Sequence, residues 1–320
     1  MNRSAILLGA LLASGASATW AQSSYPSRPI TLIVPFAAGS GTDIGARVLA
    51  KDMSDELKAP VIIENKPGAN GALGSAVAAR AKPDGYTLLV GSATTNAVNF
   101  SFFPSKLGYE PKSFDVIAGV GTSPVSLYIA TGAKWHNLAD LLAYGKAHPG
   151  QLRCGSGNAV TQVSCEIFYK LTGIDATTIP YKSNPQSLTD LAGGHIDFVF
   201  SDASVAKTFL DTKKISPIAV AASKRYPATP EVPTFLEQGV AGLEITAWTA
   251  VFAPAGTPAP VIEKLHAAVL KSSHSPESMQ LRASSGTQPL ELNLEESRHF
   301  VKEEIKRWAA YVKSSGVKPE

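Results

Sequence analysis

The amino-acid sequence predicts an α/β fold of two lobes, each a mostly parallel β-sheet flanked by helices, with a cleft between them. Short apolar, β-branched runs alternate with amphipathic segments along most of the chain, which is the pattern of strand–helix–strand units. The chain has 320 residues, of which 44% are hydrophobic and 17% are charged. A chain of this length exceeds the size at which one hydrophobic core keeps growing, so two lobes are expected.

The first lobe begins with an apolar run at residues 30–36, which predicts a strand that ends at a glycine turn. A helix is expected to follow over residues 44–57, because Thr42 or Asp43 can cap its amino end. The pattern then recurs, with a strand at 61–64, a glycine-rich segment at 67–74, a helix that reaches residue 81 and a strand at 86–90.

The second lobe shows the same alternation. Strands are expected at residues 125–130, 151–155, 177–180, 196–201 and 215–221, and the helices between them at 137–148, 161–171, 184–192 and 203–210.

The chain is expected to return to the first lobe near its carboxyl end. Residues 247–253 predict another strand, and an amphipathic run from residue 261 starts a helical tail that ends near Val312. If this tail packs on the first lobe, the chain crosses between the lobes twice, near Thr122 and near Trp248.

The predicted first lobe therefore comprises residues 22–122 and 249–320, and the second lobe comprises residues 123–248.

Residues 1–21 predict a secretory signal peptide. Arg3 supplies a basic start, residues 5–16 are apolar but too few to span a bilayer, and small residues recur at Ala16, Ala18 and Ala21. Cleavage is expected after Ala18 or Ala21. The alternative is an amino-terminal membrane anchor, which the short apolar run disfavours.

Cys154 and Cys165 are the only cysteines of the chain. In an oxidising compartment a lone pair is more often a disulfide than a reactive site, so we expect these two residues to be bonded. The alternative is two separate buried thiols.

Composition and motifs argue against several function classes. The chain carries 29 basic and 26 acidic residues, and they are scattered, so no nucleic-acid partner is expected. The glycine spacings after Gly39 and after Gly157 do not match a dinucleotide-binding motif. Because the sequence has neither a G-x-S-x-G elbow nor a close histidine pair, we expect no cofactor, no metal and no catalysis.

Two glycine-containing loops predict a binding site for an anion. Residues 37–43 (AAGSGTD) and 155–161 (GSGNAVT) each follow a strand and open a helix, so their backbone N–H groups and helix dipoles would point toward one spot. Glycine permits close approach of the backbone, and short polar side chains can orient a carboxylate. These side chains belong to Ser40, Thr42, Ser156, Asn158 and Thr161. The alternative is that they are ordinary turn and cap residues.

Two aromatic and two acidic residues complete this set. Phe36 and Trp248 can pack on the body of a ligand, although core packing is the commoner use of both residue types. Asp43 and Asp202 follow strand ends, where a carboxylate either caps a helix or accepts a hydrogen bond from a ligand; capping is favoured for Asp43.

Five stretches in order along nearly the whole chain carry a family resemblance. They are YPSRPITLIVPFAAGSGTDIGAR (25–47), NKPGANGALGSAVAARAKPDGYTLLVGS (65–92), IPYKSNPQSLTDLAGGHIDFVFSD (179–202), YPATPEVPTFLEQGV (226–240) and WTAVFAPAGTPAPVIEKL (248–265). Together they resemble the Bug-type extracytoplasmic solute receptors, the TctC-like binding proteins of tripartite tricarboxylate transporters. The sequence departs from the family's usual first loop, where consecutive glycines are common, by placing Ser40 between Gly39 and Gly41.

The resemblance implies a two-lobed periplasmic binding protein fold, type II-like, whose first strand-to-helix loop wraps a ligand carboxylate with backbone amides. That loop runs from Phe36 to Asp43 here and includes Ala37 and Gly41. The resemblance places further residues around the cleft, namely Asn70, Gly71, Ser92, Thr94, Asn96, Asp202 and the second-lobe loop of Ser156, Gly157 and Asn158.

The resemblance also implies a function. The chain would be a monomeric, non-enzymatic receptor in the periplasm that captures a small carboxylate and presents it to the membrane subunits of a transporter. One alternative is a secreted α/β enzyme that uses Asp202 and Ser156 in an unfamiliar arrangement. Another is a sensory receptor that docks on a membrane kinase.

Overall fold

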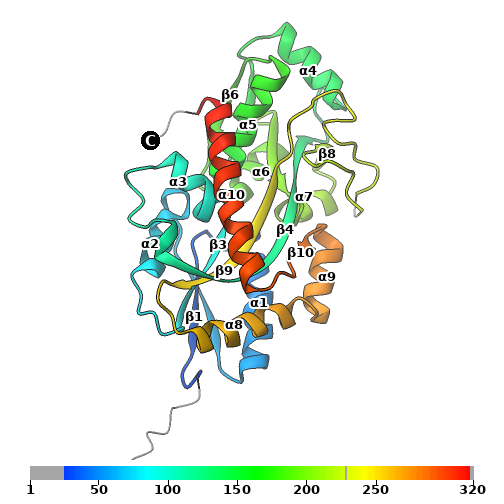
Figure 1. Cartoon of the computed structure of the whole chain (residues 1–320). Coiled ribbons are helices and arrows are strands. Elements are labelled where there is room, and N and C mark those ends of the chain that lie inside the picture. Colours follow the sequence, from blue (N-terminus) through cyan, green and yellow to red (C-terminus); the bar gives the residue numbers. More distant parts are fainter. Residues whose placement is uncertain (1–24, 228, 318–320) are drawn as a thin grey trace, which may run out of the picture.

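The computed structural model describes residues 25–227 and 229–317. The predicted signal peptide lies outside the described residues. Figure 1 shows two α/β halves that are joined by two long strands and flanked by a helix running along both.

The first half contains a sheet in the order β2-β1-β3-β9-β4. Strand β1 (Ile30–Val34) lies between β2 (Val61–Asn65) and β3 (Thr87–Ser92), and both pairings are parallel. Strand β9 (Thr246–Pro254) pairs antiparallel with β3 and with β4 (Phe114–Ala130). The two-residue strand β10 (Gln288–Pro289) pairs with β4 as well.

The two faces of this sheet are covered by different helices because side chains alternate along each strand. Ile30, Leu32 and Val34 of β1 pack in one core with α1 (Gly41–Leu57) and α8 (Ala259–Ser272). Ile33 belongs to the core on the opposite face, where α2 (Ala72–Ala79), the π-helix η2 (Thr94–Val98) and α3 (Asn99–Phe102) lie. Two short 3₁₀ turns, η1 (Ala69–Gly71) and η3 (Pro111–Ser113), complete this half.

The second half is built on the other end of β4, which pairs antiparallel with β7 (Phe198–Asp202) and β8 (Ile215–Val220). Strand β5 (Leu152–Ser156) then lies between β7 and β6 (Ala176–Pro180) in parallel pairings. The helices of this half are α4 (Leu138–Ala147), α5 (Ala159–Thr172), α6 (Asn184–Ala192) and α7 (Ala203–Asp211).

The α/β fold class is therefore confirmed, with one difference in the sheets. Strands β2, β1 and β3 in the first half and β6, β5 and β7 in the second pair in parallel, as predicted. By contrast, β4 pairs antiparallel with β7, β8 and β9, and β9 pairs antiparallel with β3. The reason is that β4 and β9 run side by side in opposite directions between the halves.

The two crossings of the chain pair with each other. Thr122 of β4 and Trp248 of β9 are Cα partners, and the ladder continues to Pro124 and Thr246. Beyond this point β4 pairs with β7 from Val125 onward. The division of the chain into lobes at residues 122 and 248 stays a prediction. The hinge expected where these two strands cross between the lobes stays a prediction as well.

The carboxyl-terminal tail contains α9 (Pro276–Ser285) and α10 (Leu294–Ser315). Helix α10 runs along both halves (Figure 1) and places Trp308 in the largest core. The Nζ of Lys170 in α5 donates to the carbonyl of Ser314 at 2.9 Å, and the hydroxyl of Tyr311 donates to the carbonyl of Glu244 at 2.6 Å. Helix α10 also packs against η2 and α3, so the tail contacts the first half, where the sequence places it, and the second half as well.

The predicted disulfide is present. Cys154 in the middle of β5 is bonded to Cys165 in α5, and both side chains are fully buried. The bond joins the two elements that flank the second glycine loop, so it holds that loop at both ends.

Candidate functional site

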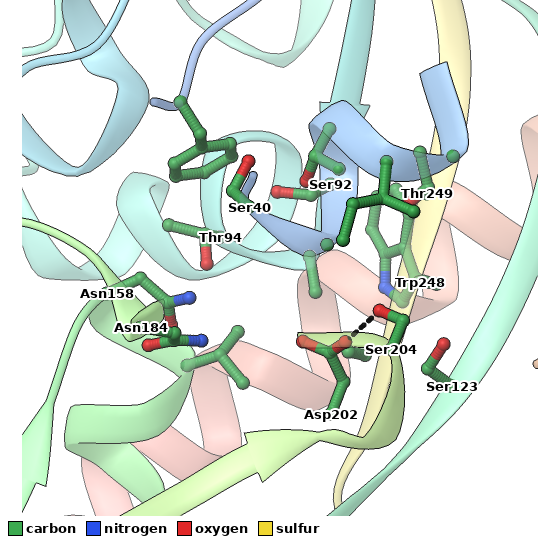
Figure 2. A pocket seen from close by; sticks show the side chains of 18 of the residues that line it. Ser40, Ser92, Thr94, Ser123, Asn158, Asn184, Asp202, Ser204, Trp248 and Thr249 are labelled. Carbon is green, nitrogen blue, oxygen red and sulfur yellow. Dashed lines mark hydrogen bonds between the residues drawn. The ribbon is translucent and has the colours of Figure 1, made fainter. Parts of the chain in front are cut away.

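A cavity of about 710 Å³ lies between the two halves of the molecule. Figure 2 shows its polar lining, which comes from the first half, the second half and the crossing strands. Fourteen of the predicted site residues line it: Phe36, Ala37, Ser40, Gly41, Thr42, Asn70, Gly71, Ser92, Thr94, Gly157, Asn158, Thr161, Asp202 and Trp248. Asp43, Asn96 and Ser156 do not.

Several helices begin at this cavity, and four of them have a polar N-cap residue. Their N-cap residues are Ser40 of α1, Asn158 of α5, Ser183 of α6 and Asp202 of α7, and all four line it. The first N–H groups of a helix have no partner within the helix and carry partial positive charge. The cavity is therefore suited to a negatively charged group.

The first loop is held from behind by Asp43. The Oγ of Ser40 accepts a hydrogen bond from the N–H of Asp43 at 3.3 Å, and the carboxylate of Asp43 accepts one from the N–H of Gly39 at 2.9 Å. Arg47 and Asn65 also donate to this carboxylate, at 2.9 Å each. Asp43 therefore supports the loop from the protein side. The expectation that Thr42 or Asp43 caps this helix was wrong, because α1 begins at Gly41 and its N-cap is Ser40.

The ionisation of Asp43 follows from these contacts. Burial favours the neutral acid, but the hydrogen bonds from Arg47, Asn65 and Gly39 and the charge of Arg47 outweigh it, so the pKa of Asp43 is lowered. The carboxylate is thus charged at neutral pH and keeps the loop in place.

The second loop is closed by its own hydroxyl groups. Asn158 accepts from the N–H of Thr161 at 3.0 Å, and the hydroxyl of Thr161 accepts from the N–H of Asn158 at 3.2 Å. The hydroxyl of Ser156 donates to the carbonyl of Asn158 at 3.1 Å. Gly157 is required by close packing, because a Cβ there would lie 2.1 Å from the backbone nitrogen of Asn184. Ser156 therefore stabilises the loop and does not face the cavity.

A third group of residues comes from the first half. Asn70 and Gly71 have positive φ values of 52° and 80°, and the carbonyl of Asn70 accepts from Asn99 at 3.0 Å. Ser92 ends β3 and Thr94 begins η2, and both line the cavity. Asn96 is turned away from it, since its Oδ1 accepts from the hydroxyl of Thr95 at 2.7 Å.

Asp202 caps α7 and faces the first half of the molecule. Its Oδ1 accepts from the N–H of Val205 at 3.2 Å and from the hydroxyl of Ser204. Gly41 lies directly opposite, because a Cβ on Gly41 would be 2.9 Å from Oδ1 and 3.1 Å from Oδ2 of Asp202. Asp202 thus caps a helix, which is one of the two roles left open by the sequence, and it also lines the cavity. A hydrogen bond from a ligand to Asp202 stays a prediction.

Two buried polar atoms of the lining have no hydrogen-bond partner among the described residues. They are the Oγ of Ser92 and the Nε1 of Trp248, on side chains whose residues are 9% and 2% exposed. Buried polar groups are normally paired. These two atoms are therefore available to a bound molecule.

Several lining residues were not predicted from sequence. Tyr181, Lys182, Ser183 and Asn184 follow β6 and open α6, so the strand-to-helix rule used for the other two loops would have found them. Arg282 of α9 also lines the cavity, and no local signal marks it. Among the described lining residues, Asp202 is the only acid.

Within residues 25–227 and 229–317, no three side chains of metal-ligating type gather into a cluster. In the same ranges no helix combines the length and apolarity that a membrane span requires.

Comparison with known proteins assigns the family. Residues 45–317 match the model of the tripartite tricarboxylate transporter family receptor. Protein BugT of Bordetella pertussis is 32% identical over 322 residues, which cover 99% of each chain.

Two solved structures are similar over nearly the whole fold. MatC from Rhodopseudomonas palustris with bound malate is 33% identical with a TM-score of 0.84, over 90% of this chain and 100% of that one. A second R. palustris protein with adipate is 30% identical with a TM-score of 0.89, over 92% of this chain and 100% of that one. The chain therefore belongs to the tripartite tricarboxylate transporter family of receptors, which are periplasmic solute-binding proteins of the Bug type.

Proposed function

We propose that this protein captures a small carboxylate in the periplasm, encloses it between two lobes and presents it to the membrane subunits of a tripartite transporter. The observation that carries the proposal is the meeting at one cavity of three helix N-termini with uncharged caps, those of α1, α5 and α6. That arrangement stabilises an anion through backbone N–H groups and helix dipoles.

The proposed binding residues are those lining residues that offer hydrogen-bond donors toward the cavity. Backbone N–H groups of the loops that start α1 and α5 take one carboxylate group, and hydroxyls such as those of Ser40, Ser92 and Thr94 orient it. The two similar structures with malate and adipate support a carboxylate as the ligand, because both compounds carry this group.

The contacts of Ser156 and Asp202 favour binding without catalysis. A nucleophilic serine needs a base that accepts its proton, but the hydroxyl of Ser156 is engaged with Asn158 and Thr161. Asp202 is bonded to Ser204 and caps α7. We therefore propose that the ligand leaves the protein unchanged. As a separate part of the proposal, the protein acts as a monomer.

A thermal-shift screen of organic acids, followed by calorimetry on the acids that raise the melting temperature, tests this function. A ligand that binds only the folded state must raise the melting temperature by mass action. We expect at least one carboxylate to bind with a stoichiometry of one per chain and to be recovered intact by mass spectrometry. Conversion of the bound acid, or binding of no carboxylate at all, would contradict the proposal.

A further inference from the structure

Two polar groups on one side of the cavity, a hydrogen-bond donor and an acceptor, lack a partner among the described residues. The donor is the indole Nε1–H of Trp248, which has no hydrogen-bond partner among the described residues although the side chain is buried. The acceptor is Oδ2 of Asp202, which receives no hydrogen bond from the described residues, while Oδ1 receives two. Both residues line the same cavity.

The fold places these two groups near the crossing of the chain. Trp248 lies in β9 opposite Thr122 of β4, and Asp202 ends β7 opposite Val125 of the same strand. In Figure 2 the indole nitrogen lies on the side of the Trp248 ring that is turned toward Ser204, whose hydroxyl is bonded to Asp202. The ring is held by edge-on packing against Phe300, with centroids 5.6 Å apart, so its nitrogen cannot turn elsewhere without disturbing the core.

The chemistry of the two groups restricts what can lie between them. A ligand carboxylate can accept a hydrogen bond from Trp248, but it cannot donate one and would be repelled by Asp202. A methylene group can neither donate nor accept a hydrogen bond. An ammonium group can donate to Asp202 but cannot accept from Trp248. A hydroxyl both donates and accepts, so it satisfies both atoms at once. Leaving a buried N–H without an acceptor is unfavourable, so a ligand that supplies one gains affinity.

We propose that the ligand is a hydroxycarboxylate whose hydroxyl group accepts a hydrogen bond from Nε1 of Trp248 and donates one to Asp202. This inference rests on the proposed function, in which the helix N-termini hold a carboxylate of the same molecule. It adds a specificity determinant: the pair Trp248 and Asp202 selects acids with a hydroxyl over acids of the same carbon frame without one.

Calorimetry on the full mature chain with matched acids tests the selection. The probes are succinate, malate and aspartate, which differ in one substituent, together with glutarate and 2-hydroxyglutarate, and 3-phenylpropionate and 3-phenyllactate. We expect the hydroxy acid to bind about tenfold more tightly than its unsubstituted partner in at least one set, since one hydrogen bond to a buried group is worth about this factor.

Variants assign the selection to the two residues. Trp248→Phe keeps the ring and removes the N–H, and it should bring the hydroxy acid and its partner to within about twofold of each other. Asp202→Ser keeps a good N-cap residue and removes the carboxylate, with the same expected result. Trp135→Phe is the matched control, because Trp135 is also buried with an unpartnered Nε1 but does not line the cavity. It should keep the wild-type preference.

Each other outcome has a defined meaning. Equal affinity for both members of every set in the wild-type protein overturns the inference while leaving the proposed function intact. A preference that survives in Trp248→Phe, or tighter binding of aspartate than of malate, also overturns it. If none of these acids nor any acid of the thermal-shift screen binds, the proposed function itself fails, and the inference with it.

Discussion

Gly41 at the start of α1 faces the carboxylate of Asp202 at the start of α7 across the cavity, so closely that a Cβ on Gly41 would lie 2.9 Å from Oδ1. The two residues belong to opposite halves of the molecule, and the contact is between a helix start and a helix cap. This position leaves no room for a side chain when the halves are in contact.

Gly41→Val should abolish carboxylate binding while the protein still folds. The added side chain would meet Asp202 and Ser204 and hold the halves apart, whereas each half keeps its own core. Calorimetry measures the binding, and circular dichroism checks the fold. Gly132→Val is the matched control, because a Cβ at Gly132 has no atom within 4 Å and this residue is not part of the cavity.

Small-angle scattering adds a second readout of the same variant. If the lobes close on a ligand, the wild-type radius of gyration should fall at saturating ligand and that of Gly41→Val should not. Wild-type affinity in the valine variant would mean that the carboxylate is held elsewhere.

Ser40→Ala should lower the free energy of unfolding by about 1 kcal/mol, because Ser40 is the N-cap of α1. Ser40→Asn keeps a capping side chain and should restore most of this stability, although the larger side chain enters the cavity. Urea unfolding of both variants without ligand measures the contribution of the cap to the free energy of unfolding, apart from any contact of Ser40 with a ligand. Equal stability of the alanine variant and the wild type would show that the cap does not matter here.

Loss of the Cys154–Cys165 bond should destabilise the protein by about 3 kcal/mol and also weaken ligand binding. The bond joins β5 to α5 on either side of the second glycine loop, so without it the loop is free to rearrange. Denaturant unfolding and calorimetry on the double variant Cys154→Ser with Cys165→Ser measure both effects. Alkylation of both thiols in unfolded, unreduced wild-type protein would rule out the bond.

The buried carboxylate of Asp43 should make stability depend on pH in the acid range. Its pKa in the folded state lies below the ordinary value of 3.8, so the stability it provides is complete above that value and is lost as the pH falls through the lower folded-state pKa. Asp43→Asn should be less stable at neutral pH and lose less stability on acidification. Urea unfolding from about pH 6 to about pH 3 tests this.

The control for this variant is Asp211→Asn, which removes an exposed carboxylate paired with Lys207. It should be nearly as stable as the wild type at neutral pH, because exposed ion pairs contribute little. An acid profile of Asp43→Asn parallel to that of the wild type would contradict the assignment.

Most elements of the fold could be predicted from local pattern. Strands such as β1 and helices such as α6 were predicted within a few residues, because each carries its own periodicity and its own boundary residues. The first part of β4, from Phe114 to Pro124, was missed. Its glycines and proline look like a loop, and its pairing with β9 joins residues more than a hundred positions apart.

The candidate site could also be predicted only in part. Loop position could be predicted, since strand ends of an α/β fold meet at one edge, and this brought Ser40, Asn158 and Asp202 together. Side-chain direction could not. Asp43 and Ser156 have suitable chemistry but turn back to hold their own loops, and only the packed structure distinguishes these two uses.

Helix α10 and strand β9 also set the order in which the chain can fold. The first half lacks its strand between β3 and β4 until residues 246–254 are present, and the largest core lacks Trp308 until the last helix has formed. The strands of the second half, by contrast, all lie between residues 125 and 220. During synthesis the strands of the second half can therefore pair first, and the sheet of the first half must wait for residues 246–254. Truncation of α10 should affect both halves, because this helix contacts α5 as well as η2 and α3.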